Sequence, residues 1–208
     1  GNEAWEQFLL GAIIGVDAIH LLSRLPIVGE EYVVFQYKTK GLKESGSHVI
    51  DIGIGPSPML YYAVKKLNSG GGIMITGSHN PSNYNGFKIL SSSKSYYGEE
   101  LIKLSNKKIK KNRNIKGKSM YFNIVDSYIS ELLKAAKNIN KKIKVVWDPG
   151  NGATCEVLKK LIRIIPGEHF LINSFIDGTF PSHDPDPTIE KNLIQLKKEV
   201  IVNKADVG

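Results

Sequence analysis

Apolar residues along the chain alternate between short unbroken runs and stretches with helical spacing. The runs 48–54 and 72–76 are short, apolar and bounded by turn-forming residues, a pattern that predicts buried strands. Between them, residues 56–67 begin with prolines and repeat apolar side chains at helical spacing, which is typical of an amphipathic helix. The same reasoning predicts a strand from Gly86 and helices over residues 97–106 and 121–139.

The longest apolar stretch lies near the N-terminus, over residues 8–22. It contains Asp17 and His20, and we interpret it as a buried helix. Glutamates and no basic residue precede it, so it lacks the pattern of a secretory signal peptide. It is also shorter than the roughly 18 to 20 apolar residues that a helix needs to cross a bilayer. We therefore expect no membrane partner.

Strand-like and helix-like patterns continue to alternate after the residues near Lys141. The predicted order is a strand (145–147), a glycine-rich turn (148–153), a helix ending at 162, a strand (169–175), a loop (177–187) and a helix opening at 188. Such alternation favours an α/β fold with mixed, mostly parallel sheets and helices on both faces. We place a domain boundary near Lys141, which gives domains over residues 1–140 and 141–208.

Composition and charge limit the classes of protein to which this chain can belong. The chain has 208 residues, of which 41% are hydrophobic and 23% charged, as in globular proteins. Its one cysteine, Cys155, excludes an internal disulfide and fits a reducing, cytoplasmic location. The net charge of +8 is concentrated in residues 107–118. That run has no interleaved aromatic residues, which favours a solvated connector over a nucleic-acid-binding module, and a basic surface also suits an anionic substrate.

Ser78 is the first candidate for chemistry, because it follows the predicted strand 72–76 and precedes a run of turn-forming residues. Ligands of open α/β sheets bind at the carboxyl ends of strands. Ser78 could therefore be a nucleophile or carry a phosphoryl group, or it could be a solvated turn residue. The Gly-x-Ser-x-Gly elbow of hydrolases is absent. Lys88 could hold a phosphate or carry a proton, or it could be an ordinary surface lysine.

Two further segments are weaker candidates. The turn 148–153 could offer backbone N–H groups to an anion, although a structural tight turn is the favoured interpretation because no Walker pattern follows it. The loop 177–187 contains four residues that could bind a metal ion, but its prolines favour a stiff loop with capping aspartates. These four residues are Asp177, His183, Asp184 and Asp186.

Taken together, these segments resemble the alpha-D-phosphohexomutase family, which includes phosphomannomutases and phosphoglucomutases. The resemblance covers roughly residues 49–208. It is carried by TGSHNP (76–81), NGFK (85–88), DPGNGA (148–153), DGTFP (177–181) with PDP (185–187), and EKNL (190–193), in that order. The family usually has alanine where Gly77 stands. The resemblance implies the fold of domains I and II of that family, here incomplete.

The resemblance also implies an activity and a set of site residues. Ser78 would carry the phosphoryl group that interconverts hexose 1- and 6-phosphates through a bisphosphate sugar, with a hexose 1,6-bisphosphate as activator. His79 would contact the reacting phosphate, and Lys88 would move protons to and from the sugar hydroxyl. The cofactor would be Mg²⁺, bound through the phosphate of Ser78. The residues expected to bind substrate or phosphate are Thr76, Gly77, Asn80 and Asn85.

The sequence departs from the family pattern at several points. The Asp-Gly-Asp-Gly-Asp loop that holds the Mg²⁺ would follow residues 203–208, and domains III and IV are not represented. A Gly-Arg-Asp-x-Arg motif is reduced to FQYKT at 35–39, and residues 40–48 leave room for only a short connector in place of a helix. We therefore expect a mutase fragment that is inactive alone, with a companion chain carrying domains III and IV. The alternative is a non-catalytic remnant, or half of a split enzyme, with only anion binding. The sugar specificity does not follow from the sequence.

Overall fold

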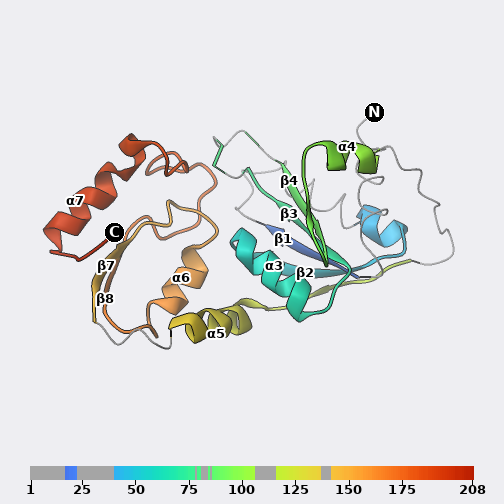
Figure 1. The fold of residues 1–208 in the computed structure, drawn as a ribbon, viewed down its shortest axis with the longest axis horizontal. Coiled ribbons are helices and arrows are strands. Elements are labelled where there is room, and N and C mark those ends of the chain that lie inside the picture. The colour runs from blue at the N-terminus through green and yellow to red at the C-terminus, as the bar shows by residue number, and fades with distance from the viewer. Residues whose placement is uncertain are drawn as a thin grey trace.

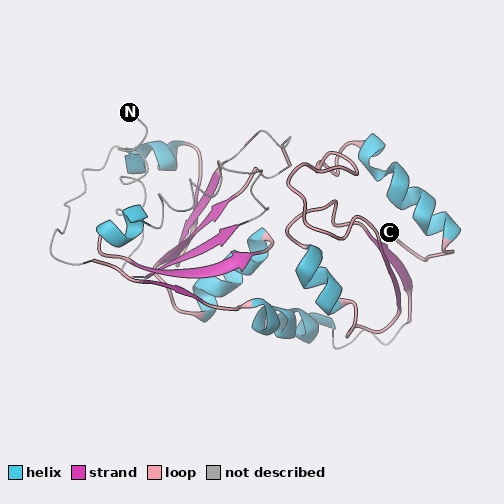
Figure 2. Cartoon of the chain, turned by 180° about the vertical axis from the view of Figure 1, so that it is seen from behind, coloured by secondary structure: helices cyan, strands magenta, loops and turns pink. Residues whose placement is uncertain are grey.

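The computed structural model describes residues 17–22, 40–77, 79–80, 84, 86–105, 116–136 and 142–208. These residues form two lobes that lie side by side (Figure 1). The first lobe is built around a six-stranded sheet and the second around a two-stranded sheet. Figure 2 shows the same arrangement from behind, with the strands of the first lobe fanning out on one side and the second lobe on the other.

Strand β1 lies in the middle of the sheet of the first lobe, although it is the first strand among the described residues. The order in the sheet is β5-β4-β3-β1-β2-β6. Strand β1 pairs in parallel with β2 and β3, and β2 pairs in parallel with β6, whereas β4 is antiparallel to both β3 and β5. The predicted mixed, mostly parallel α/β sheet is confirmed. The strands are β1 (Asp17–Leu22), β2 (His48–Ile54), β3 (Gly71–Ile75), β4 (Phe87–Ser91), β5 (Ser95–Tyr96) and β6 (Ser119–Tyr121).

Helix α3 (Ser57–Lys66) packs against the sheet at β3 and β1. Its buried residues belong to one apolar cluster with Met74 on β3 and Leu90 on β4. Gly72 permits the close approach of helix and sheet, because a Cβ atom there would lie 2.7 Å from Val64 Cγ2. The burial of this apolar face stabilises the lobe through the hydrophobic effect.

The second lobe contains the parallel pair β7 (Lys144–Trp147) and β8 (Glu168–Leu171). Val207 forms a parallel bridge with Val145, so the C-terminus lies beside β7 (Figure 1). The remaining elements of the lobe are α6 (Cys155–Leu161), the short 3-10 helix η1 (Glu190–Leu193) and α7 (Ile194–Val202).

Helix α5 (Val125–Ala136) connects the lobes, because it packs against both α3 and α6. The hydroxyl of Tyr62 on α3 donates a hydrogen bond to the carbonyl oxygen of Ser127 at 3.1 Å. The Tyr62 ring also lies 5.6 Å, between centroids, from that of Tyr128. The contacts of α5 with α3 and α6 therefore join the two lobes.

Several predicted elements need correction. Residues 17–22 form a strand and not part of a helix, because this apolar stretch pairs with strands on both sides; residues 8–16 lie outside the described part of the chain. Residues 40–44 are helical, where only a connector was expected. The predicted helix 121–139 begins only at Val125, where the backbone N–H bonds to the side-chain oxygen of Asn123 at 3.1 Å.

Other predicted elements are confirmed with shifted ends. The helices predicted over 56–67 and 97–106 correspond to α3 and to α4 (Glu99–Ser105). The strand predicted over 169–175 ends at Leu171. The helix expected to open at 188 begins as η1 and continues as α7. Strands β5 and β6 were not predicted.

Two predicted segments fall largely on residues that the structure does not describe. These are the FQYKT segment at 35–39 and the basic run 107–118, of which only residues 116–118 are described. Within the described residues, the helices are all too short or too polar to reach across a lipid bilayer.

Candidate functional site

A cleft of about 530 Å³ lies between the two lobes, at the carboxyl ends of β2, β3 and β7. The segments that follow these strands line it, as expected for ligand sites in open α/β sheets. The first lobe contributes Ser57, Thr76, Gly77, His79 and Lys88, and the second contributes Asp148, Gly150, Thr154, His183 and Asn192, among others.

The described residues of the segment between β3 and β4 form three hydrogen bonds with one another. The N–H of Thr76 donates to the carbonyl oxygen of Gly86 at 3.0 Å, which closes the base of the loop. The backbone N–H and side-chain amide of Asn80 both donate to the carbonyl oxygen of Gly77, at 3.1 and 2.9 Å. Asn80 therefore shapes the turn, while His79 is exposed.

Lys88 lies on β4 directly opposite Met74 on β3, and its ammonium reaches the start of α3. Its Nζ donates a hydrogen bond to the Ser57 hydroxyl at 2.9 Å. The Ser57 hydroxyl in turn donates to Met74 Sδ at 3.2 Å. All three residues line the cleft, so one lysine charge is held at its edge.

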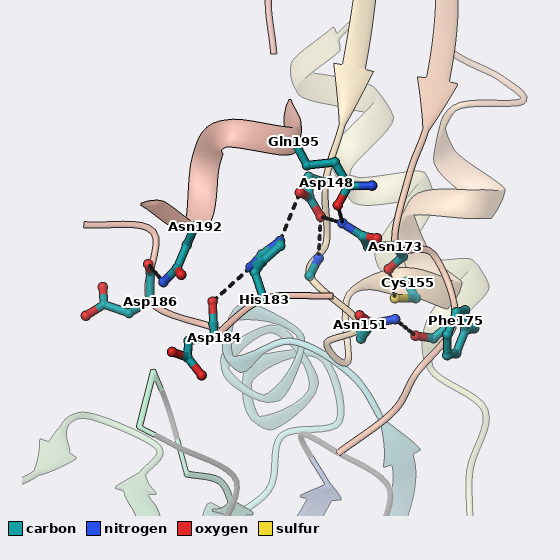
Figure 3. A network of polar contacts seen from close by, with 11 residues as sticks. Asp148, Asn151, Cys155, Asn173, Phe175, His183, Asp184, Asp186, Asn192 and Gln195 are labelled. Atoms are coloured by element: carbon teal, nitrogen blue, oxygen red, sulfur yellow. Dashed lines mark hydrogen bonds and ion pairs between the residues drawn. The ribbon is translucent and has the colours of Figure 1, made fainter. Parts of the chain in front are cut away.

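In the second lobe, the carboxylate of Asp148 is the centre of a polar network (Figure 3). One oxygen, Oδ1, accepts hydrogen bonds from the N–H of Gly150 at 2.9 Å and from the Asn173 amide at 3.0 Å. The other, Oδ2, lies 3.0 Å from His183 Nε2. The Asp148 side chain is only 5% exposed, so these contacts replace its hydration. The network connects the β7–α6 turn, the end of β8 and the loop that carries His183.

Each ring nitrogen of His183 faces an oxygen atom, and a protonated ring can donate to both. Nδ1 lies 2.8 Å from the carbonyl oxygen of Asp184, and Nε2 faces the Asp148 carboxylate, and both partners accept hydrogen bonds only. Burial acts to lower the pKa of His183, but the bonds to Asp184 and Asp148 outweigh it and raise the pKa above 6.5. These contacts therefore favour the protonated form of His183, next to the carboxylate of Asp148.

The glycine-rich turn 148–153 uses its backbone N–H groups internally. Besides the Gly150 bond to Asp148, the N–H of Asn151 donates to the Asn173 carbonyl oxygen at 2.9 Å and that of Gly152 donates to Pro149 at 2.9 Å. These three groups are therefore not directed at a ligand. The structural interpretation of this turn is confirmed.

The aspartates of the loop 177–187 cap its own turns. Asp177 Oδ1 accepts bonds from the Thr179 N–H and hydroxyl at 2.9 and 2.7 Å, and Asp186 Oδ1 accepts the equivalent bonds from Thr188 at the same distances. Hydrogen bonds from these threonine hydroxyls lower the pKa of both carboxyls. Among the residues that the structure describes, no three His, Cys, Asp or Glu side chains come together as a metal site.

The structure brings four of the residues singled out in the sequence to one cleft, namely Thr76, Gly77, His79 and Lys88. Asn80 is described but is not part of the cleft lining. Ser78 and Asn85 lie outside the described residues.

Sequence reasoning missed the role of two polar residues in the cleft. Ser57 follows a proline after a predicted strand, and that position at a strand end was an available signal. His183 was considered only as a metal ligand, because its pairing with Asp148 spans 35 residues.

Comparison with protein families gives two matches. Residues 33–116 match the model "Phosphoglucomutase/phosphomannomutase, alpha/beta/alpha domain I", and residues 126–208 match the model for domain II of the same family. A phosphomannomutase/phosphoglucomutase of Pseudomonas syringae is 39% identical over 175 residues, covering 83% of this chain and 37% of that protein. A phosphoglucomutase of Neisseria meningitidis is 32% identical, covering 84% of this chain and 38% of that protein.

A crystal structure of a phosphoglucomutase/phosphomannomutase family protein from Burkholderia thailandensis has the same fold. The TM-score is 0.83 at 24% identity, and the match covers 98% of this chain and 46% of the other. The chain spans a little over a third of the length of the curated relatives, 37% and 38% for the two described.

Proposed function

Because the chain belongs to the phosphoglucomutase/phosphomannomutase family, we propose that it forms the domain I and II part of an enzyme that interconverts hexose 1- and 6-phosphates. This is an intramolecular phosphotransferase, an isomerase of carbohydrate metabolism. The observation that supports the proposal is the shared cleft. His79 and Lys88 line it next to the loop that contains Ser78, and the turn after β7 closes its other side.

In the proposed reaction, a phosphoryl group on Ser78 Oγ passes to a hydroxyl of a bound hexose phosphate. The bond between phosphorus and the serine oxygen breaks, and a bond between phosphorus and the sugar oxygen forms. Over the whole step the proton of the sugar hydroxyl ends on the Ser78 oxygen, and Lys88 relays it. Return transfer from the other phosphorylated oxygen of the sugar completes the isomerisation and restores the phosphoserine.

The cleft residues contribute mainly charge and position, which dominate phosphoryl transfer. The Lys88 ammonium would face the negative oxygens of the phosphate. His79 would contact the same phosphate, and Thr76, Gly77, Asn80 and Asn85 would shape and line its site. His183 adds little net charge, because Asp148 neutralises it.

The Mg²⁺ that the family resemblance implies does not fit the described residues, because no group of three possible ligands comes together in them. The resemblance assigns the aspartate ligands to a loop after residue 208. We therefore assign no step of this chain's chemistry to the metal. Full turnover would depend on that loop and on domains III and IV, from a companion chain or the rest of a longer protein, so we propose that these residues alone do not isomerise sugar phosphates.

The proposal includes the remaining expectations from the sequence. The substrate is a hexose phosphate, a hexose 1,6-bisphosphate is the activator, and the location is cytoplasmic. The domains are residues 1–140 and 141–208, of which the first carries the phosphoserine loop. Specific nucleic-acid binding and membrane binding are not part of the proposal.

Intact-mass analysis tests the proposal most directly. The chain is incubated with glucose 1,6-bisphosphate and Mg²⁺, and the variants Ser78→Ala and Ser82→Ala are treated in the same way. We expect the wild type and Ser82→Ala to gain the mass of one phosphoryl group and Ser78→Ala to gain none. A folded wild-type sample that gains no phosphoryl group would favour the alternative, a non-catalytic remnant of the fold.

A further inference from the structure

The position of Lys88 depends on a neighbour that is remote in the sequence. The Ser57 hydroxyl accepts a hydrogen bond from Lys88 Nζ at 2.9 Å, across 31 residues of the chain. Among the ion pairs of the described residues, none involves Lys88. Within that part of the molecule, the hydroxyl of Ser57 is thus the group that orients the lysine charge.

The Lys88 ammonium can only donate this hydrogen bond, and Met74 determines where the proton of the Ser57 hydroxyl points. A thioether sulfur accepts a hydrogen bond and has no proton to donate, so the contact of 3.2 Å between Ser57 Oγ and Met74 Sδ uses the serine proton. The lone pairs of Ser57 Oγ are then available to Lys88. A hydroxyl that could rotate freely would present either its proton or its lone pairs, whereas this one is held as an acceptor.

The three groups come from three different elements, which makes the arrangement rigid. Met74 and Lys88 are direct cross-strand partners on β3 and β4, so their side chains point to the same face of the sheet. Ser57 is the first residue of α3, which packs against β3 on the face where Met74 is buried. The ammonium therefore has a defined place at the edge of the apolar core and the cleft.

We propose that Ser57 is a positioning residue for Lys88, one that holds the ammonium in one place and directs it into the cleft. The effect on catalysis rests on the proposed function, in which a fixed position of Lys88 assists phosphoryl transfer. Lysine has a long flexible side chain, and a group that relays a proton acts efficiently only when it is held in place. Ser57 acts through Lys88 and needs no contact with the sugar.

The variants Ser57→Thr and Ser57→Val test this inference as a matched pair, because threonine and valine have the same shape and differ in the hydroxyl. The first readout is the reactivity of Lys88 itself. The chain is labelled with a trace of acetic anhydride, and peptide mapping measures the acetylation of Lys88 relative to the exposed Lys116. The reagent needs free access to the lysine nitrogen, so a Lys88 side chain held in the hydrogen bond to Ser57 should react more slowly than one that has lost this partner.

We expect Lys88 acetylation in Ser57→Val to be at least about threefold that in Ser57→Thr, with Ser57→Thr close to the wild type. Equal labelling in the two variants would overturn the inference. Thermal unfolding of both variants shows whether α3 is equally stable in them, so a general loosening of the lobe is distinguished from a local effect on Lys88.

The second readout is the rate at which Ser78 gains a phosphoryl group from glucose 1,6-bisphosphate. We expect Ser57→Val to slow this rate at least about fivefold relative to Ser57→Thr, with little change in the concentration of bisphosphate at half-maximal rate. A change in that concentration alone would contradict a positioning role. If even the wild type is not phosphorylated, the proposed function fails while the labelling experiment still decides the Ser57–Lys88 relationship.

Discussion

His183 and Asp148 form a partly buried pair in which the ring Nε2 lies 3.0 Å from the carboxylate Oδ2. The side chain of His183 is 17% exposed and that of Asp148 5%, so the pair is largely shielded from water. The pair fastens the loop that carries His183 to the turn after β7, and both segments line the cleft. The pair therefore joins two segments of the same cleft wall.

The stability of the second lobe should depend on pH through His183. Its pKa is raised in the fold above the ordinary value of 6.5, so the folded protein binds the proton more tightly than the unfolded chain does. The stability that this provides is complete below pH 6.5 and is lost as the pH rises through the raised pKa. Urea unfolding over a pH series should show the decline, and His183→Gln should reduce it. The same decline in His183→Gln would contradict this assignment.

The coupling between His183 and Asp148 should be measurable in a double-mutant cycle. We expect the pair Asp148→Asn and His183→Gln to give a coupling free energy of about 1–3 kcal/mol at about pH 6, because each partner otherwise leaves a buried polar group unsatisfied. The pair of Asp126 and Lys160 is a suitable control, since its side chains are 72% and 46% exposed. Its coupling should not exceed about 1 kcal/mol. Equal coupling free energies in the two cycles would contradict the expectation that the less exposed pair is coupled more strongly.

Cys155 should react with alkylating reagents only when the chain unfolds. Its side chain is fully buried, and this burial raises the pKa of the thiol to about 11. Because the thiolate is the reactive form, iodoacetamide at neutral pH should label the native chain far more slowly than the chain in concentrated urea. Mass spectrometry measures both rates on the same thiol. Rapid labelling of the native chain would show that α6 opens readily.

Gly117→Ala should destabilise the first lobe by about 2 kcal/mol or more, because a Cβ atom at this position would overlap the carbonyl oxygen of Ser47. The obstacle is backbone, and the N–H of Gly117 is itself bonded to the carbonyl oxygen of Lys43 at 2.8 Å. The neighbouring Lys116 is exposed, so Lys116→Ala should change the free energy of unfolding by less than about 0.5 kcal/mol. Thermal and urea unfolding of the two variants check this difference.

The sequence predicted those elements whose pattern is local. Helix α3 and strand β3 each carry a complete signal within their own residues, since one has an apolar stripe at helical spacing and the other a short buried run between turns. The prediction of a helix over residues 17–22 was wrong because a continuous apolar stretch does not distinguish a buried helix from a strand. Strand β6 has three exposed side chains and is defined only by its pairing with β2, which no local pattern indicates.

The candidate site shows the same division between local and remote information. His79 and Lys88 stand in a recognisable motif near the end of one strand, and the fold does place them in the cleft. Ser57 and His183 acquire their roles from partners 31 and 35 residues away, and those contacts exist only after the strands are paired. The residues next to Ser57 and His183 in the sequence contain no pattern that indicates these partners.

The central position of β1 has a consequence for how the first lobe is made. Of the described strands, a ribosome synthesises β1 first, and β2 and β3 later pair with its two sides. Each strand produced after them adds to an edge that already exists, β4 to β3, β5 to β4 and β6 to β2. These described strands can thus be added outward from the middle of the sheet in the order of synthesis, and none of them has to be inserted between two others that are already paired.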